Sequence, residues 1–523
     1  MNLPIDNQPW PPPEYAPALE QVRKDAAWLT GDMAEIRQQV EGEKPKPYVS
    51  RAQFNGGLVG ATARGVLGRP NMGGSVRVER HLPVAAELVT ISANLLAEKP
   101  PAVSLHEDDA TNTSAAQALD DLTSTDLFAA EWWEACYNAS GHGWVFGRVV
   151  WNVDVQPHPW IEWVDGDQGY AEFRNGRQVS VTFWDTFKDG DGKKVWRLLQ
   201  KHTTGRIEYG LYEGTEEKLG RRVPVTEHPA TEYLADLLDA ESSIMTGITG
   251  LTARMFRNLE KNPNWRHHPQ LRYYGHSDVS KGGGLWADID MAWTNLMNDV
   301  ESGRGRLLVS EEFLTSGGPG QGQVFDWMRD VYPLAQGGSP DAAGTIEKVQ
   351  FDMRVEENTA AVSVATMKAV DAVGLSHMTV GMDPQATGDM TATETRARSD
   401  KTIKTAGGKA RQSRAELSEL LTAYIQMDAA MNNYPAPARP VNVAIVEPVQ
   451  DTDEDRARRA KSLREADAAS TYYLVRDLHP EWTEPQVEEE VARIIQERQA
   501  GMPVDPFNVG ADMSLNPSQL DNE

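Results

Sequence analysis

The sequence predicts an α+β fold in which a β-rich region lies between helical regions. Residues 81–97 and 286–300 repeat their apolar side chains at spacings of three and four, the period of one helix face. Residues 143–219 are instead rich in β-branched and aromatic side chains, and Asp-Gly and Asn-Gly turn signals interrupt them. Helical spacing returns in residues 450–500.

The composition is that of a folded protein with several structural units. At 523 residues the chain is longer than one hydrophobic core usually supports, so two to four units are expected. A hydrophobic fraction of 40%, with 15 Trp and 14 Tyr, argues against wholesale disorder. We find no apolar run long enough to span a bilayer, and the N-terminal residues lack the features of a secretion signal. No membrane partner is therefore expected.

Charge and cysteine content narrow the function classes. The net charge is −26, and an acidic surface repels phosphates, so tight binding of nucleic acid is disfavoured. A protein that lets DNA slide past without sticking is still compatible with this charge. The single cysteine, Cys136, excludes an internal disulfide. Its aromatic neighbours favour a buried structural thiol over a nucleophile, which would need a histidine partner.

The N-terminal half predicts helices followed by a meander. A Pro-rich lead precedes a helix from Pro17 to about Val40. A second helix covers 81–97 and ends at Pro100 and Pro101, and a third runs from Ser114 to Trp133. The strands of 143–219 are expected to pair antiparallel because their connections are too short for crossover helices.

The segment from Trp286 to Val300 predicts an amphipathic helix about 22 Å long. Its apolar face carries Trp286, Ile289, Trp293, Leu296 and Val300. Its other face carries Asp288, Asp290, Asn295, Asn298 and Asp299. Such a helix could equally pack on its own domain, so the pattern alone does not identify an interface.

Beyond this helix, residues 302–352 are Gly-rich with short β stretches, and a further helix is expected at 354–373. An irregular polar segment then leads into a long helix at 393–428, whose first half is basic. Its cations are Arg396, Arg398, Lys401, Lys404, Lys409, Arg411 and Arg414. They form either a solvated face that pairs with nearby acids, or a contact with phosphates or with a neighbouring subunit.

Motifs of common catalytic sites are missing. We find no GxxxxGK[ST] loop, no GxGxxG after a strand, no HExxH and no GxSxG. His267, His268 and His276 lack metal-ligand spacing to acidic or cysteine partners. The sequence therefore predicts no catalytic residue, no cofactor and no metal, and the protein is not expected to be an enzyme.

Several stretches, taken in order, resemble the portal proteins of tailed bacteriophages, especially long-tailed phages of actinobacteria. They include HLPVAAELVTISANLLAEKPP, RLLQKHTTGRIEYGLYEGTEEKLGRRVPV and YYGHSDVSKGGGLWADIDMAWTNLMNDVESGRGRLLV. They continue with VQFDMRVEENTAAVSVATMKAVDAVGLS, MTATETRARSDKTIKTAGGKARQSRAELSELL and READAASTYYLVRDLHPEWTEPQVEEEVARI. The resemblance covers roughly residues 80 to 500.

The resemblance implies a portal fold with a helical stem, a β-rich wing and clip, and an α-helical crown. By position it gives an N-terminal extension at 1–50, a wing at 51–285, stem helices at 286–301 and 353–373, a clip at 302–352, a tunnel loop at 374–392, a long wing helix and return strand at 393–449, a crown at 450–500, and a flexible tail at 501–523.

The resemblance also implies a head-tail connector that forms a ring of twelve at one capsid vertex of the virion, assembled in the host cytoplasm. Double-stranded DNA would pass through its channel without sequence specificity during packaging and ejection. Expected partners are the large subunit of the terminase, which supplies the ATP chemistry, a later head-tail adaptor, and the major capsid and scaffolding proteins.

Candidate site residues follow from these assignments. The residues expected to line the channel are Asp288, Asp299, Met378, Asp383 and Asp389. The residues expected at the subunit interface are Trp286, Ile289, Trp293, Leu296, Arg396 and Lys401. Two other readings stay open: a minor head or scaffold protein without a channel, and an acidic cytosolic enzyme with an unrecognised site.

Overall fold

The computed structural model describes most of the chain, and the chain divides into two compact units. The described residues are 3–41, 80–152, 155–188, 194–302, 306–309, 315–316, 323–324, 346–349, 354–382, 392–445, 453–479 and 484–500. The first unit spans Met1–Met390 and Glu394–Pro448, and the second spans Thr391–Thr393 and Val449–Glu523. With helices and antiparallel sheets in the first unit, the predicted α+β class is confirmed.

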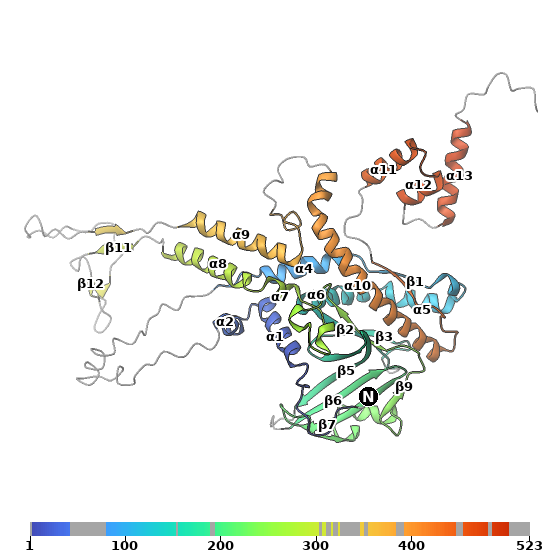
Figure 1. Ribbon diagram of the computed structural model, residues 1–523, viewed down its shortest axis with the longest axis horizontal. Coiled ribbons are helices and arrows are strands. Elements are labelled where there is room, and N and C mark those ends of the chain that lie inside the picture. The colour runs from blue at the N-terminus through green and yellow to red at the C-terminus, as the bar shows by residue number, and fades with distance from the viewer. Residues whose placement is uncertain are drawn as a thin grey trace, which may run out of the picture. The chain divides into compact units, whose positions relative to one another are not determined.

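The first unit contains the helices that build most of the body (Figure 1). They are α1 (Ala16–Thr30), α2 (Met33–Glu41), α4 (Val84–Ala97), α5 (Thr113–Thr123), α6 (Asp126–His142), α7 (Asp278–Gly282), α8 (Leu285–Ser302), α9 (Val355–Val373) and α10 (Ala392–Asn432). Short 3-10 turns cover Glu107–Asp109, Val225–Glu227, Glu232–Asp236, Pro263–Trp265 and Leu271–Tyr273.

Two predicted helices are each divided in two by local capping. The helix predicted from Pro17 to Val40 stops at Gly31, which has a left-handed φ of 70°, and Asp32 accepts a hydrogen bond from Ala34 N (3.0 Å) to begin α2. The helix predicted from Ser114 to Trp133 is likewise interrupted. Thr125 Oγ1 accepts from Phe128 N (3.1 Å) and caps the start of α6.

The strands confirm the antiparallel meander. The first unit contains β1 (Ala102–Ser104), β2 (Trp144–Val150), β3 (Trp160–Val164), β4 (Gly169–Arg174), β5 (Arg177–Lys188), β6 (Val195–Thr203), β7 (Arg206–Gly214), β8 (Arg221–Val223), β9 (Ser243–Met245), β10 (Ala253–Arg257), β11 (Arg306–Val309), β12 (Thr315–Ser316), β13 (Gln323–Val324), β14 (Ile346–Val349) and β15 (Asn442–Ala444). The largest sheet runs β4-β5-β6-β7-β8, with β9 paired to β7. A second sheet has the order β10-β2-β3, and β1-β15, β11-β14 and β12-β13 form three two-stranded ladders.

The N-terminal residues pack on the sheets instead of forming a free arm. Trp10 and Tyr15 are buried in one core with Tyr170 and Phe183 of the meander. Tyr15 stacks on Tyr170 with ring centroids 4.3 Å apart. Burial of large aromatic side chains is among the strongest contributions to packing, so residues 3–41 belong to the folded body.

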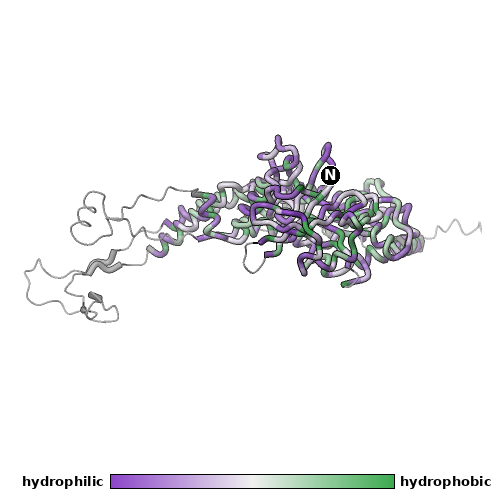
Figure 2. Tube along the Cα trace, turned by 90° about the horizontal axis from the view of Figure 1, so that it is seen from below, coloured by the Kyte–Doolittle hydropathy of each residue, from purple (hydrophilic) through white to green (hydrophobic). Residues whose placement is uncertain are grey.

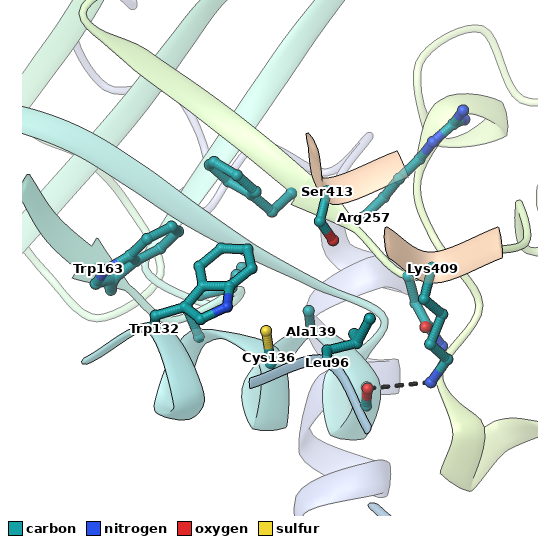
Figure 3. A pocket seen from close by; sticks show the side chains of 13 residues that line it. Leu96, Trp132, Cys136, Ala139, Trp163, Arg257, Lys409 and Ser413 are labelled. Atoms are coloured by element: carbon teal, nitrogen blue, oxygen red, sulfur yellow. Dashed lines mark hydrogen bonds between the residues drawn. The ribbon is translucent and has the colours of Figure 1, made fainter. Parts of the chain in front are cut away.

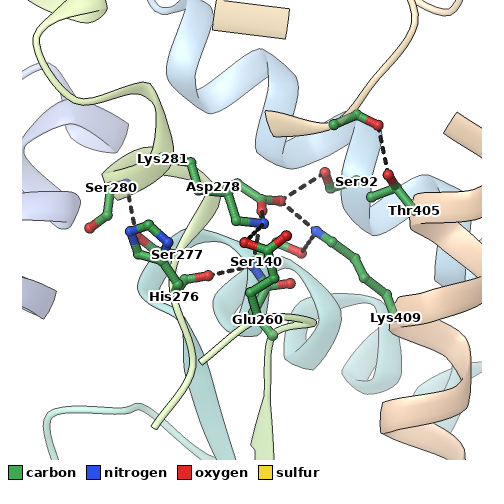
Figure 4. Close-up of polar contacts among 12 residues, drawn as sticks. Ser92, Ser140, Glu260, His276, Ser277, Asp278, Ser280, Lys281, Thr405 and Lys409 are labelled. Carbon is green, nitrogen blue, oxygen red and sulfur yellow. Dashed lines mark hydrogen bonds and ion pairs between the residues drawn. The ribbon is translucent and has the colours of Figure 1, made fainter. Parts of the chain in front are cut away.

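The helices of the first unit are joined by a buried polar cluster (Figure 4). Lys409 Nζ on α10 forms an ion pair with Asp278 Oδ2 on α7, and it also donates to Ser140 Oγ on α6 at 3.1 Å. Asp278 further accepts from Ser92 Oγ on α4 (3.0 Å) and from Asn258 Nδ2 after β10 (2.9 Å). The ion pair of Asp278 and Lys409 thus connects four helices, α4, α6, α7 and α10, with the residue that follows β10.

Charge keeps this cluster ionised in spite of its burial. Burial alone would raise the pKa of Asp278, but the positive charges of Lys409 and Lys281 outweigh it and hold that pKa below its ordinary value. Burial lowers the pKa of Lys409, and the charge of Asp278 opposes that effect. Such a pair adds little net stability, but the loss of one partner leaves the other charge buried and costly.

A second buried carboxylate fastens α1 to α7. Asp25 accepts hydrogen bonds from Ser277 Oγ (2.6 Å), Ser280 Oγ (3.0 Å) and Gln21 Nε2 (2.9 Å). No cation contacts it at ion-pair distance among the described residues. Burial therefore raises the pKa of Asp25 to about 7, although the three hydrogen bonds oppose the shift.

The second unit is helical where it is described. It contains α11 (Asp453–Glu465), α12 (Thr471–Leu478) and α13 (Glu484–Ala500). Leu474, Val475 and Val487 are buried between these helices, and Arg459 pairs with Asp477 (2.7 Å). Across the described parts of both units, no helix has the length and apolar character needed to cross a membrane.

Replacement of Lys409 by methionine should destabilise the protein by about 3 kcal/mol, the lower end of the range for a broken buried pair, because Lys281 still contacts Asp278. Denaturant unfolding measures this change. The matched control is Lys404→Met, which breaks the exposed Lys404–Asp400 pair on the same helix and should cost less than about 1 kcal/mol. Equal losses in the two variants would contradict a structural role for the buried pair.

Asp25 should make stability fall as pH rises. Its folded-state pKa of about 7 lies above its ordinary value, so its contribution is fully present below about pH 4 and is lost progressively as pH rises to about 7. Asp25→Asn should therefore raise the melting temperature more at about pH 8 than at about pH 5. Glu20→Gln, which removes an exposed carboxyl of the same helix, should keep the wild-type pH dependence. A pH-independent effect of Asp25→Asn would contradict the assignment.

Candidate functional site

The helices predicted at 286–300 and 354–373 are α8 and α9. They form one antiparallel hairpin that extends away from the sheets (Figure 1). At its base, Ile289 of α8 is buried with Val370 and Val373 of α9. At its tip, Asn358 Nδ2 of α9 donates to Asp299 Oδ2 of α8 (2.9 Å). The strands that follow and precede it, β11 and β14, pair antiparallel from Arg306↔Val349 to Val309↔Ile346, so the hairpin continues into a two-stranded ladder.

A short segment before α4 lies along α8. His81 Nδ1 contacts Asp290 Oδ2 at 2.8 Å, and Leu82 N donates to Asp290 Oδ1 at 2.9 Å. Arg80 N donates to Thr294 Oγ1 (3.0 Å), and the Arg80 guanidinium pairs with Glu301. Residues 80–82 of the same chain therefore cover part of the polar face of α8. The sequence offered no signal for this contact, because these partners lie more than 200 positions apart.

The predicted interface residues lie mostly on the inner side of the hairpin. Trp286 and Ile289 are 3% and 1% exposed and belong to the chain's own core, and Leu296 is also buried. Trp293 is half-buried. The large apolar side chains that face solvent on the hairpin are Met291, Val300, Val355 and Val364. In Figure 2 the tube of the hairpin changes repeatedly between hydrophobic and hydrophilic residues.

The predicted channel-lining residues have different surroundings. Asp288 is exposed and lies at a hollow of about 320 Å³ between α2 and α8. Asp299 Oδ2 accepts the hydrogen bond of Asn358 Nδ2 and lies 3.7 Å from Arg354 Nε, so Asp299 links α8 to α9 at the hairpin tip. Met378 is half-buried, and its Sδ accepts a long contact from Ser399 Oγ (3.9 Å). Asp383 and Asp389, and the side chain of the interface candidate Arg396, lie outside the described residues.

The basic stretch of α10 meets acids of its own chain. Lys401 Nζ donates to the carboxylate and to the backbone carbonyl of Asp371, both at 2.9 Å, which places a cation at the C-terminus of α9. The hydrogen bond and charge of Lys401 hold the pKa of Asp371 below its ordinary value. Lys404 pairs with Asp400 (2.6 Å), and Lys409 is buried on Asp278. These three lysines are thus used within the subunit.

Hydroxyl groups fasten the segment after α9 to α10. Ser376 N donates to Thr402 Oγ1 (2.9 Å), and Thr379 Oγ1 lies 2.7 Å from the same oxygen. Thr405 Oγ1 donates to the carbonyl of Gly374 (2.7 Å), which ends α9 with a left-handed φ of 92°. Residues 374–382 form no helix or strand, as the sequence pattern predicted, but hydrogen bonds fix the start of this segment on α10.

Cys136 lies in the core, as the sequence predicted (Figure 3). It lines a cavity of about 10 Å³ with Trp132 and Lys409, which is barely the volume for one water. Burial raises the pKa of the Cys136 thiol, which disfavours the reactive thiolate. Within the described residues, no cluster of His, Cys, Asp or Glu is arranged to hold a metal ion.

Replacement of Thr402 by valine should loosen the segment that follows α9. The change keeps the shape of the side chain and removes the oxygen that Ser376 N uses, at a cost of about 1–3 kcal/mol for the unsatisfied amide. Hydrogen exchange of residues 374–382 should become faster, while that of the meander stays unchanged. Thr402→Ser should restore protection. Unchanged exchange in the valine variant would show that the hydroxyl does not hold the segment.

One family model matches most of the chain. Residues 76–503 match the family described as "Phage portal protein, SPP1 Gp6-like". A search of curated proteins finds no match. A solved structure described as "Virion of native gene transfer agent (GTA) particle" is 13% identical, covers 85% of this chain and 97% of that chain, and has a TM-score of 0.40. Another, "Neck of empty GTA particle computed with C6 symmetry", is 14% identical, with coverages of 75% and 88% and a TM-score of 0.40. Because the family match spans most of its length, this chain belongs to the SPP1 Gp6-like phage portal protein family.

Proposed function

We propose that the chain is a subunit of a closed ring of twelve copies at one vertex of a phage capsid. The ring forms a channel through which double-stranded DNA enters during packaging and leaves during ejection. Membership of the portal family supports this role, and the family is structural, which fits a subunit that does not hydrolyse nucleotide itself.

The main support for this ring is the set of exposed apolar side chains on the α8–α9 hairpin. Met291, Val300, Val355 and Val364 face solvent on a helix pair that extends away from the sheets. Apolar side chains arranged in this way are typical of surfaces that become buried against a partner. In a ring, each hairpin would meet the hairpins of identical neighbours on both sides.

The hairpin then corresponds to the stem. Trp286, Ile289 and Leu296 would support the interface from inside, by holding α8 on its own body, and Trp293 and the four exposed apolar residues would contact neighbours. We assign the clip to 302–352, the tunnel loop to 374–392, the wing helix to α10 and the crown to 450–500. The fixed start of residues 374–382 on α10 would give the tunnel loop a rigid attachment.

The charge of the subunit suits a channel that does not retain DNA. With a net charge of −26, carboxylates outnumber cations in the subunit, so a passing duplex would be repelled, release few counterions and bind weakly, whatever its sequence. We propose that Asp288 at the base of α8 and Asp299 at the hairpin tip face the channel, and that Met378, Asp383 and Asp389 do so from the tunnel loop. Lys401 Nζ already donates to Asp371, so Lys401 would contact a neighbouring subunit only through an N–H of its ammonium group that Asp371 does not use.

Assembly partners follow from the same assignment. The large subunit of the terminase and later a head-tail adaptor would dock on the clip, and the major capsid and scaffolding proteins would surround the wing. These contacts would put the protein at the portal vertex of the virion, after assembly in the host cytoplasm. They are proposals that follow from the family.

Electron microscopy of the purified protein tests the ring directly. Closed rings are expected for the wild type. The double variant Met291→Glu and Val364→Glu should not form rings. Its subunits should unfold at the temperature of wild-type subunits kept apart by dilution, because both side chains are exposed in the subunit. Ile5→Glu, which charges an exposed apolar residue outside the hairpin, should still form rings. Rings in the double variant, or a wild type that stays monomeric at all concentrations, would contradict the proposal.

A further inference from the structure

A second exposed apolar surface lies at the turn between β2 and β3. Two hollows flank this turn, with volumes of about 460 Å³ and 390 Å³. Val155 and Trp160 line both of them, so these two residues form a ridge between the hollows. We call the larger one the helix hollow, because α5, α6 and Tyr424 of α10 line it, and the smaller one the sheet hollow, because Leu198 of β6 and Tyr209 of β7 line it.

Large apolar side chains at both hollows face solvent. Val155 on the ridge is 68% exposed, and Leu127 in the helix hollow is 67% exposed. Tyr233 and Leu237 in the sheet hollow are also exposed. An apolar surface shaped by two adjacent hollows is more typical of a docking site than single scattered apolar residues are.

The charged groups around this surface are mostly carboxylates. Glu131 lines the helix hollow, and Glu162 and Asp185 line the sheet hollow. The cation of the sheet hollow, Arg148, is already occupied, since it donates to Glu162 Oε2 (2.8 Å) and to Gln200 Oε1 (2.5 Å). In the helix hollow, His158 is occupied by the buried carboxylate of Asp428 (2.7 Å). Negative charge is therefore left over on both sides of the ridge.

These carboxylates interact with one another. Burial raises the pKa of Glu131, and the charges of Glu134 and Glu162 raise it further. Burial also raises the pKa of Asp185; Arg148 opposes this effect, while Glu162 adds to it. An added positive charge would relieve both the repulsion and the desolvation, whereas an added carboxylate would increase them.

We propose that the two hollows dock a segment of a partner protein that carries lysine or arginine side chains between apolar ones. Apolar side chains would fill the hollows on either side of Val155, and the basic side chains would reach Glu131 and Asp185. A second copy of this chain fits less well. Its net charge is −26, and three lysines of its most basic stretch are already bound within the subunit. This site is separate from the α8–α9 hairpin and does not depend on ring formation.

Fluorescence anisotropy with a labelled peptide of leucine and arginine separated by glycine tests the site on the purified protein, at about 0.15 M salt to suppress diffuse attraction. The peptide should bind, and analogues with glutamate for arginine or serine for leucine should bind at least about tenfold more weakly. Leu127→Ser with Val155→Ser should also weaken binding about tenfold, since both side chains are exposed and the fold should tolerate the change.

A charge-matched control separates the site from the overall acidity. Glu131→Gln with Asp185→Asn should weaken binding about tenfold, whereas Glu98→Gln with Glu107→Gln, exposed acids that line neither hollow, should not change it. Equal loss in both double variants would overturn the proposal in favour of diffuse attraction. Absence of binding to wild-type rings would overturn it in favour of burial against a neighbouring copy. Either result would leave the ring itself, seen by microscopy, unaffected.

Discussion

The buried ion pair between Lys409 and Asp278 is the constraint on which the first unit depends. Lys409 shares one face of α10 with Thr402 and Thr405, at spacings of three and four residues. Through this face α10 holds α7, the end of α9 and the segment that follows α9. Since α7 leads directly into α8, one polar stripe fixes both helices of the hairpin at their base. An unpaired charge at this depth would cost several kcal/mol, so the arrangement is strongly preferred.

The α8–α9 hairpin combines a base that is packed on the core of the subunit with apolar side chains that are exposed to solvent. The base of the hairpin is packed on its own core through Ile289 and Val370, whereas Met291, Val300 and Val364 toward the tip lie in water. Each such side chain gains about 1.5–3 kcal/mol when it is fully buried. Among the described residues none covers these side chains, so a partner could supply that gain. The family to which the chain belongs suggests that the partner is an identical subunit.

Sequence periodicity predicted the helices and strands whose apolar pattern repeats over many residues. It did not predict the individual contacts between them. The spacing of Trp286, Ile289, Trp293 and Leu296 located α8 within two residues, and the short turns located the meander. However, this apolar spacing does not distinguish a Trp286 buried in the subunit's own core from one buried against a neighbouring subunit, because both environments require an apolar side chain. The Lys409–Asp278 pair was also out of reach, since many acids could have paired with a lysine of that basic stretch.

The central claim is that the exposed apolar side chains of the α8–α9 hairpin lie in water in the subunit and become buried on assembly. Hydrogen–deuterium exchange compares the two states in one experiment, with subunits kept apart by dilution and the assembled form at high concentration. Residues 291–300 and 355–364 should gain protection on assembly, while the core strands β5 and β6 should exchange equally slowly in both. Identical exchange of the hairpin in both states would mean that no neighbour covers it, and the account would be wrong.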